Sequence, residues 1–565
     1  MLQTDVARAL NEIADMHDVL GDRFRPRTYR RAARSIENSS EDLLKLMESD
    51  SLTSIPGVGK NIALKIEEFI QTGKIQHLEK LRKKVPPGVA QLLSIPDVGP
   101  RTALILHKQL GIESIDDLER AIHEHRLRPL KGMGEKTEEN ILRGIQLVRG
   151  GAGRMILGYA LPIAARIRDY LGELPGVERM SLAGSIRRMK ETIGDIDVLV
   201  TTDSPPAVAE KFVSMPWVSD VLVSGETKSS VLLEDGLQVD LRIVPDDCFG
   251  AALQYFTGSK DHNIKLREIS QRCELKLSEY GLFDQDGKRV AGRTEEEIYK
   301  HLGMDYVPPE LRENTGEIDA ATRGELPDLV EYGDALGDFH VHTSWSDGRQ
   351  GIEKVANSAR EMDYDFICIT DHSKTLQIAH GLKEDDILRQ IDEIDRLNSE
   401  MKDGPRILAG IEVEIRSDGT LDTDDSVLGE LDLVIGSIHS GFKSDEKTMT
   451  SRIVDAISTG SLTILGHPTG RILGKREPYP INEDRVFEAA IDAGTMMEIN
   501  AFPERLDLND RMARRAAEAG LKLAIGTDSH DVDQMRYMQF GISVARRAWL
   551  ERKHLANCHP FPTRE

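Results

Sequence analysis

Gly194-Asp-Ile-Asp-Val-Leu-Val200 is the stretch that decides the fold of the middle of this chain. Its apolar residues alternate with acidic ones. Asp195 and Asp197 therefore share one side of the predicted strand, because strand side chains alternate. A second predicted strand, Gln238-Val-Asp-Leu-Arg-Ile-Val244, projects Asp240 in the same manner. Three carboxylates on one sheet face would repel one another unless cations lay between them. The two strands therefore predict a site for a pair of divalent metal ions.

A Gly-Ser turn and two arginines stand just before this acidic strand, at Gly184-Ser185 and Arg187-Arg188. A lone Asp-x-Asp is more often a surface loop. The turn, the basic pair and the third aspartate on its own strand weigh against that interpretation. Two Mg²⁺ ions about 4 Å apart would neutralise the carboxylates, activate an attacking hydroxyl and hold a leaving pyrophosphate. The constellation indicates nucleotidyl transfer.

The length of 565 residues is too great for one core and predicts roughly two to four domains. The composition, 39% hydrophobic and 30% charged, is typical of a soluble globular protein. No apolar run approaches the roughly 18 residues of a membrane span, and Asp5, Arg8 and Glu12 interrupt any signal-peptide pattern. The four cysteines form no Cys-x-x-Cys pair, which predicts buried thiols in a reducing cytoplasm.

The net charge of −23 is unevenly distributed along the chain. Residues 1–150 contain 24 Lys and Arg against 22 Asp and Glu, so this is the one region that is not acidic. A local basic face matters more for phosphate contact than the global sum. A solvated helix face is the alternative for the cluster formed by Arg23, Arg25, Arg27, Arg30, Arg31 and Arg34.

Three similar turns recur in the first third, at Ile55-Pro-Gly-Val-Gly59, Ile95-Pro-Asp-Val-Gly99 and Leu130-Lys-Gly-Met-Gly134. Each precedes an apolar-periodic segment that predicts a helix, and their spacing indicates an internal repeat. Glycine lets the backbone turn tightly, and the following helix N-terminus attracts an anion. The turns resemble helix-hairpin-helix motifs, which hold nucleic-acid phosphates without reading sequence. This predicts DNA contacts at Gly57, Gly59, Gly99, Gly132 and Gly134.

The last third repeats a short apolar strand followed by a helix, which is typical of an α/β domain such as a barrel. Histidines and carboxylates stand at the ends of these strands, and in a β/α barrel such ends open on one rim. Mixed imidazole and carboxylate ligands suit Zn²⁺, Mn²⁺ or Fe²⁺. Nine ligands exceed the need of one ion and predict two or three ions in a phosphodiester hydrolase. The predicted ligands are His340, His342, Asp347, His372, Glu412, His439, His467, Asp528 and His530.

The central stretches, Leu182-Ala-Gly-Ser-Ile-Arg-Arg188 and Gly194-Asp-Ile-Asp-Val-Leu199, resemble the palm of family X DNA polymerases, the group of polymerase beta. The resemblance implies that Asp195, Asp197 and Asp240 bind the catalytic Mg²⁺ or Mn²⁺ ions. It continues through Tyr255-Phe-Thr-Gly-Ser259. It further implies that the incoming nucleotide contacts Gly184, Ser185, Arg188, Tyr255, Phe256, Gly258 and Asn263, and that Arg267 lies on the template side.

The N-terminal region also resembles that family, where Lys65 aligns with a lysine that some members use as a Schiff-base nucleophile towards an abasic sugar. Asn61 stands where a phosphate-binding lysine is usual, and Arg25 replaces another. Binding of a gap's 5′-phosphate is therefore expected. A solvated helix lysine is the favoured alternative to lyase chemistry at Lys65.

Residues 334–565 resemble the polymerase and histidinol phosphatase (PHP) domain, and all nine ligand positions of that family are occupied. The resemblance implies an active manganese-dependent 3′–5′ exonuclease with Mn²⁺ or Zn²⁺ bound. His380 stands where Asn is expected before a glycine. Three interpretations of His380 are open: a substrate contact, an extra metal ligand or neutral variation. Lys374, Arg416 and Arg471 are candidates to hold DNA phosphates, with ordinary surface charge as the favoured alternative.

The expected fold is multidomain, α+β and α/β: helix-hairpin-helix regions, a nucleotidyltransferase palm with a mixed sheet, a thumb and a distorted β/α barrel. The expected boundaries are 1–85 for an N-terminal helical domain, 86–150 for a second helix-hairpin-helix region, 151–245 for the palm, 246–315 for the thumb, 316–337 for a linker and 338–565 for the hydrolase. The expected partners are gapped or nicked double-stranded DNA and deoxynucleoside triphosphates. A cytoplasmic monomer without membrane contact is expected.

Two rival functions remain on the sequence alone. One is a template-independent nucleotidyltransferase with a small-molecule phosphoesterase, which would fit both metal sites but not the three hairpin turns. The other is a DNA-binding tether with dead active sites, against which the complete carboxylate and histidine sets argue.

Overall fold

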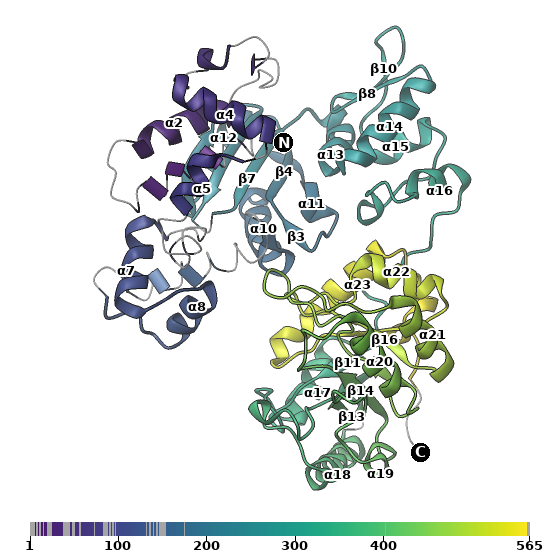
Figure 1. Cartoon of the computed structure of the whole chain (residues 1–565). Helices are drawn as coiled ribbons and strands as arrows, with labels where there is room; N and C mark the ends of the chain where they lie inside the picture. The colour runs from purple at the N-terminus through teal and green to yellow at the C-terminus, as the bar shows by residue number, and fades with distance from the viewer. Residues whose placement is uncertain are drawn as a thin grey trace. The chain divides into compact units, whose positions relative to one another are not determined.

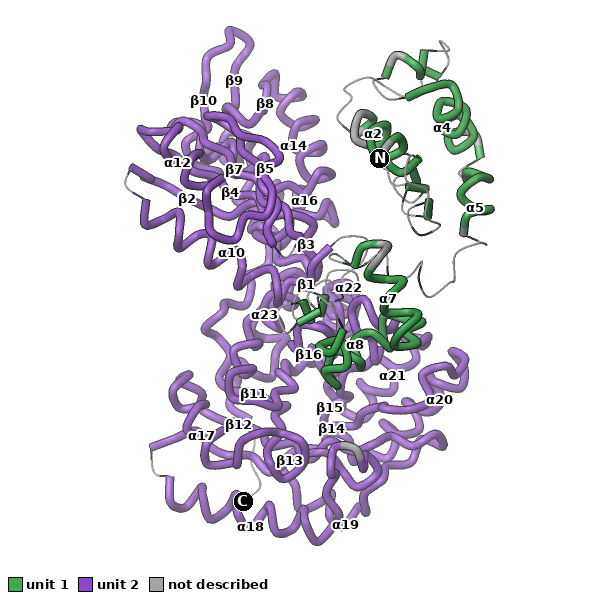
Figure 2. The backbone as a smooth tube through the Cα atoms, turned by 90° about the vertical axis from the view of Figure 1, so that its left-hand side faces the viewer, with its two compact units in different colours: residues 1–153 green, residues 154–565 purple. Residues whose placement is uncertain are grey.

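The computed structural model divides into two compact units, residues 1–153 and 154–565 (Figure 2). It describes residues 154–561 except 175, 235 and 402. In the first unit it describes 25–37, 51–55, 58–72, 74–82 and 98–130, with single residues and short runs between and beyond them. The expected boundary at residue 150 lies close to the division between the units.

The first unit is helical where it is described, and its amphipathic helices share one apolar core (Figure 1). Each of the three turns predicted from the sequence has the same hydrogen bond, from Val58 N to Ile55 O, Val98 N to Ile95 O and Met133 N to Leu130 O. The internal repeat is therefore present in the backbone as well as in the sequence. The helices are α2 (Arg25–Glu37), η1 (Leu52–Ser54), α4 (Lys60–Thr72), α5 (Gln76–Arg82), α7 (Pro100–Leu110) and α8 (Ile115–His123).

The palm is built on a mixed sheet of five strands in the order β2-β4-β7-β6-β5. The two acidic strands β4 and β7 are parallel neighbours, and the other pairs are antiparallel. The elements are β1 (Met155–Ile156), α10 (Leu157–Gly172), β2 (Val177–Ala183), α11 (Gly184–Arg187), β3 (Thr192–Ile193), β4 (Asp195–Thr202), α12 (Pro205–Val213), β5 (Val218–Val223), β6 (Lys228–Leu233) and β7 (Gln238–Ile243).

The thumb packs helices around a small antiparallel sheet and has its own apolar core. The elements are η2 (Asp246–Cys248), α13 (Phe249–Thr257), α14 (Lys260–Arg272), β8 (Lys276–Ser278), β9 (Gly281–Phe283), β10 (Arg289–Ala291), α15 (Glu295–His301) and η3 (Pro309–Leu311). Residues 316–337, the expected linker, include helix α16 (Glu317–Arg323), whose Ile318 and Ala321 belong to the thumb core.

The C-terminal part is a parallel sheet of seven strands paired in chain order. A parallel bridge between Val341 and Ser529 joins the first strand to the residues that follow the last, so the sheet approaches a closed barrel. The strands are β11 (Gly337–Val341), β12 (Phe366–Ile369), β13 (Arg406–Glu414), β14 (Leu433–Ser437), β15 (Ile464–Leu465), β16 (Met496–Asn500) and β17 (Leu523–Gly526). The expected fold class is confirmed.

Helices follow these strands around the barrel (Figure 1). They are α17 (Ile352–Glu361), η4 (Gln377–Ala379), α18 (Glu384–Glu400), α19 (Asp425–Leu428), α20 (Glu446–Ile457), α21 (Glu483–Ala493), α22 (Asp510–Glu518), η5 (Val532–Tyr537), α23 (Met538–Arg547), η6 (Arg552–His554) and η7 (Ala556–Cys558).

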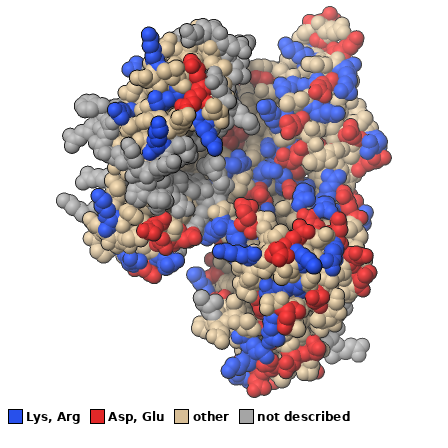
Figure 3. All heavy atoms as spheres, viewed as in Figure 1, with Lys and Arg blue, Asp and Glu red and all other residues tan. Residues whose placement is uncertain are grey.

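Lysines and arginines are interspersed with acidic residues over the face of the molecule in Figure 3. None of the described helices combines the length and apolar character needed to cross a bilayer. Cys248, Cys368 and Cys558 are buried thiols as predicted. The prediction is wrong for Cys273, which is exposed because it caps the C-terminus of α14 at the surface.

Candidate active sites

The palm brings its three predicted carboxylates together on adjacent strands. Strands β4 and β7 pair in parallel with Asp197 directly opposite Asp240, and Asp195 lies two residues earlier on β4. The apolar residues between them are buried in the palm core, which turns the acidic side chains to the other face. Gln238 Nε2 donates to Asp240 Oδ1 at 2.8 Å, and Lys228 Nζ lies 3.8 Å from Asp240 Oδ2. Sequence reasoning did not identify these two partners.

Burial and neighbouring carboxylates raise the proton affinity of two members of this triad, Asp195 and Asp197. Burial first, and then the charges of Asp195 and Asp240, raise the pKa of Asp197 to about 7. Burial and Asp240 likewise raise the pKa of Asp195. Such mutual destabilisation of anions is removed by divalent cations, so the donor set fits the expected Mg²⁺ or Mn²⁺ ions.

Gly184 is required by the close approach of its backbone to this triad. Its φ is +67°, a region that favours glycine, and a Cβ at this position would collide with Asp197 Oδ2. The Gly-Ser turn begins helix α11 beside the carboxylates, with Ser185 next to Gly184. The glycine therefore lets the Asp197 carboxylate lie against the main chain of this turn.

The other predicted nucleotide contacts lie on α11, α13 and α14 or directly after α11 and α13. Arg188 donates from Nε to Glu313 Oε1 at 2.9 Å and from Nη1 to Thr257 O. Asn263 is buried, and its amide bonds to Tyr255 O and to Gln254, both at 2.7 Å. Tyr255 and Phe256 are half-buried with their rings edge to face, and Gly258 follows them at a φ of +72°. Arg267 is exposed and donates to Asn263 O at 3.2 Å.

In the first unit, Gly59, Gly99 and Gly134 precede helical residues and accept backbone hydrogen bonds from them. Gly57 and Gly132 lie outside the described residues. Lys65 is half-buried on α4, bonds to Asn61 O at 3.0 Å and lies 6.0 Å from the centre of the Tyr29 ring. Burial lowers the pKa of Lys65, which favours the neutral amine that nucleophilic chemistry requires.

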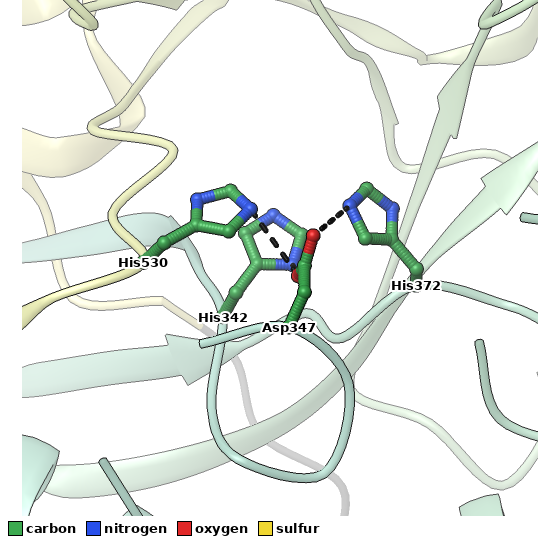
Figure 4. A group of neighbouring side chains, drawn as sticks. All are labelled: His342, Asp347, His372 and His530. Carbon is green, nitrogen blue, oxygen red and sulfur yellow. Dashed lines mark ion pairs between the residues drawn. The ribbon is translucent and has the colours of Figure 1, made fainter. Parts of the chain in front are cut away.

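The barrel gathers the nine predicted metal ligands at one rim. Three groups each place their ligand atoms within 4.8 Å of one another: His342, Asp347, His372 and His530; His340, His342 and Glu412; and His372, Glu412 and His439. In the first group, His530 and His372 flank Asp347 from two sides (Figure 4). The remaining two predicted ligands are His467 and Asp528. His467 Nε2 lies 3.0 Å from Glu412 Oε1, and Asp528 Oδ1 lies 3.3 Å from His342 Nε2.

Two buried glutamates that the sequence did not reveal orient the histidines. His340 Nδ1 lies 2.7 Å from Glu498 Oε1, and His439 Nδ1 lies 2.8 Å from Glu414 Oε2. A proton held on Nδ1 by a carboxylate leaves Nε2 with its lone pair directed into the cluster. The sequence does contain a sign of both glutamates, because each one stands in an apolar strand. That sign is weak, because the sequence does not identify the histidine that each glutamate contacts.

The charges of this centre are strongly coupled. Burial, followed by His530 and His372, lowers the pKa of His342 to about 3, and burial also lowers the pKa of His467 to about 3. Burial opposes the charged form of His439, but Glu412 and Glu414 raise its pKa to about 9. Coordination to a cation requires a neutral imidazole. The positive charge of a bound cation would also disfavour protonation of His439.

Unpaired buried atoms at this centre fit the expected metal ions. Within the part of the chain that the structure describes, the inaccessible atoms His342 Nδ1 and His467 Nδ1 have no hydrogen-bond partner, although a buried polar atom normally has one. Glu412 Oε2 lies 2.7 Å from His372 Nδ1 as an ion pair. A cavity of about 390 Å³ opens onto the ligands. The residues present therefore match a cluster of divalent cations that bind imidazole and carboxylate.

The same cavity is lined by four residues that the sequence did not single out: Leu376, Phe502, Arg505 and Gln534. Phe502 and Arg505 follow the end of β16, so the strand-end rule that found the ligands also applies to them. His380 is exposed in a left-handed conformation after η4 and is absent from the cavity lining.

The three basic residues proposed near the rim have different surroundings. Lys374 pairs with Glu384. Arg416 is exposed and donates to Leu421 O at 3.1 Å. The favoured surface-charge interpretation is wrong for Arg471, which is buried and donates to Glu191 of the palm at 2.8 Å, because the barrel packs against the palm there.

The fold and the two sites define a nucleotidyltransferase joined to a metal-dependent hydrolase. Family models match the chain as a helix-hairpin-helix domain over 1–75, a SAM-like helix-hairpin-helix tandem over 89–146, a DNA polymerase beta thumb over 252–313 and a PHP domain over 338–501.

Whole-chain similarity identifies the family. The chain is 38% identical to the DNA polymerase/3′-5′ exonuclease PolX of Bacillus subtilis over 561 residues, covering 99% of this chain and 97% of that protein. It is 27% identical to DNA polymerase lambda of Rattus norvegicus, over 54% of this chain and 56% of the relative. A protein named as a probable phosphatase of Thermoanaerobacter is 31% identical over 34% of this chain and 78% of the relative. The chain belongs to the family X DNA polymerases that carry a PHP domain.

Proposed function

We propose that this protein is a DNA-directed DNA polymerase that fills gaps during DNA repair and trims 3′ ends with a metal-dependent 3′–5′ exonuclease. One observation carries the proposal: three carboxylates on adjacent palm strands and nine histidines and carboxylates clustered in the barrel occur together in one chain of this family. The two reactions require separate metal centres, and these lie on different sheets.

Asp195, Asp197 and Asp240 would hold Mg²⁺ or Mn²⁺ in the palm. Bound divalent ions supply Lewis acidity and lower the cost of deprotonating the attacking primer hydroxyl. Asp240 would orient that hydroxyl, since Gln238 and Lys228 hold its carboxylate in place. Ser185, Arg188 and the main chain at Gly184 would bind the triphosphate. Tyr255, Phe256 and Gly258 would face the sugar, Asn263 the nascent base and Arg267 the template.

The nine barrel residues would hold two or three ions of Mn²⁺, Zn²⁺ or both. Such ions supply an activated water and stabilise charge on the phosphodiester. His340 and His439 would be fixed as ligands by Glu498 and Glu414. The cavity of about 390 Å³ has room for a terminal nucleotide at these ligands.

The helix-hairpin-helix turns would bind the phosphates of gapped or nicked duplex DNA through backbone N–H groups and helix N-termini. The basic side chains of α2, among them the exposed Arg25, Arg30 and Arg31, would add charge attraction. The protein would act as a cytoplasmic monomer with deoxynucleoside triphosphates as substrates.

Two variants test the assignment of the two centres. A gapped duplex with a labelled primer is incubated with Mg²⁺ or Mn²⁺, with and without nucleotides. The double replacement of Asp195 and Asp197 by Ala should abolish incorporation and spare trimming. His340→Ala should lose trimming and keep incorporation. Loss of both activities in a folded variant of either kind would contradict two independent centres.

The rival function, a template-independent nucleotidyltransferase with a small-molecule phosphatase, draws on the partial similarity to a probable phosphatase. Primer extension on a template and on a single strand separates the two. Equal extension on both substrates would support the rival.

A further inference from the structure

A helix of the hydrolase domain contacts the nucleotide site of the palm. Arg547, at the end of α23, donates from Nη1 to the main-chain oxygen of Arg188 at 2.9 Å and to Glu313 Oε1 at 3.2 Å. Its Nη2 donates to Asp510 Oδ2 at 2.6 Å. Arg547 is only 9% exposed, so these bonds form in a largely desolvated place.

Glu313 is the carboxylate shared between the two domains. Its Oε1 accepts from Arg188 Nε at 2.9 Å as well as from Arg547, and Lys190 Nζ lies 3.9 Å away. Burial opposes the charged form of Glu313, but Arg188, Arg547 and Lys190 lower its pKa. Three cations therefore compete for one anion, and the position of each depends on the others.

The arrangement fixes one end of the Arg188 guanidinium and leaves the other available. Nε is held by Glu313 and Nη1 by Thr257 O, whereas Nη2 has no hydrogen-bond partner among the residues that the structure describes. Arg188 directly follows α11, which begins at the Gly184-Ser185 turn beside the acidic triad. A phosphate oxygen at this turn would find Nη2 as a donor.

We propose that Arg547 of the hydrolase domain is a positioning residue for nucleotide addition: it holds the Arg188 main chain and Glu313 so that Arg188 faces the incoming triphosphate. Asp510 at the start of α22 anchors Arg547 from the hydrolase side. Without Arg547, Glu313 would be left to Arg188 and Lys190 alone and would draw the Arg188 guanidinium towards itself. The inference rests on the proposed triphosphate role of Arg188.

Arg546 provides a matched control on the same helix. It also joins α23 to the thumb through Glu310 Oε1 at 2.7 Å, and to the segment after the thumb through Val330 O at 2.8 Å. It has no contact with Arg188 or Glu313 among the bonds of the described residues. Arg546→Ala therefore loosens the junction between the domains and leaves the shared carboxylate in place.

The test measures kcat and KM for single-nucleotide incorporation on a gapped duplex with the full-length chain. Arg547→Ala should raise the KM for the nucleotide roughly tenfold, the scale of one lost charge-assisted hydrogen bond, with little change in kcat. Arg546→Ala should leave this KM unchanged, and both variants should keep trimming of a labelled single strand. Adding Glu313→Gln to Arg547→Ala should raise the KM by a smaller factor than Glu313→Gln does alone, because both replacements act through Arg188.

Asp510→Asn serves as a second variant that keeps the buried guanidinium, should Arg547→Ala fail to fold. It should raise the KM in the same direction by about threefold, since it removes one of several anchors. An unchanged KM in folded Arg547→Ala would overturn the inference. If Arg547→Ala does not fold, an unchanged KM in Asp510→Asn would overturn it. An equal rise in Arg546→Ala would also overturn it. Absence of incorporation by the unaltered protein would instead refute the proposed function, and this inference with it.

Discussion

Replacing Glu498 with glutamine should weaken the metal centre of the barrel without changing its shape. Glu498 and His340 are both fully buried, and the 2.7 Å bond between them fixes the proton of the imidazole on Nδ1. Glu498 Oε2 also accepts the main-chain N–H of His467 at 2.5 Å. A glutamine cannot serve both donors, because one of its two groups is itself a donor.

The two orientations of that glutamine predict the size of the effect. If its oxygen faces His340, its amide group opposes the His467 N–H. If it turns round, its amide forces the His340 proton onto Nε2 and removes the lone pair that faces the ligands. Loss of such a supporting carboxylate typically costs 10–100-fold in metal affinity, or about 1.4–2.7 kcal/mol.

Calorimetric titration with Mn²⁺ measures this loss directly, and trimming activity as a function of Mn²⁺ concentration measures it in the working enzyme. Nucleotide incorporation should stay unchanged. Glu488→Gln, an exposed position on α21, makes the same change of charge and should leave the affinity unaltered. An affinity of Glu498→Gln within twofold of the unaltered protein would refute the reasoning.

Three further replacements have expected outcomes. Gly184→Ala should reduce incorporation by roughly a hundredfold in a primer-extension assay and spare trimming, because its Cβ would displace Asp197. Gly526→Ala should reduce trimming by at least about tenfold and spare incorporation, since its Cβ would collide with the His340 side chain. Burial opposes ionisation of Glu295, but neighbouring arginines hold its pKa at about 2 against an ordinary 4.5. The carboxylate therefore stabilises the fold above pH 4.5. The free energy of unfolding, measured in urea, should exceed that of the Glu295→Gln variant above pH 4.5. This difference should shrink by about 3 kcal/mol as the pH falls from 4.5 towards 2.

The residues to which we assign the chemistry are accessible from local patterns. Asp195, Asp197 and Asp240 were placed on one sheet face by alternation along two short strands, and the structure pairs those strands in register. The nine predicted hydrolase ligands come from a second local pattern, in which histidines and carboxylates follow the ends of apolar strands. A parallel barrel gathers those ends on one rim, so a one-dimensional pattern predicts a three-dimensional cluster.

The groups that hold these residues were not accessible in the same way. Glu498 lies 158 positions from His340, and Arg547 lies 359 positions from Arg188. The local sequence around a glutamate in an apolar strand, or around an arginine at a helix end, does not indicate which distant atom that residue will contact. Arg471 is an example: the sequence favours a surface charge at this position, but the structure buries its side chain against the palm.

The sequence by itself therefore determined the fold class, the repeated hairpin turns and the set of candidate reactive side chains. Each of these depends on spacing within one strand, turn or helix, which backbone geometry imposes locally. The tertiary structure alone decided which carboxylates orient the histidines, which ionisable groups have shifted pKa values and how helix α23 contacts Arg188 and Glu313. Those properties depend on burial and on charges within a few ångströms, and both arise only when distant segments of the chain pack together.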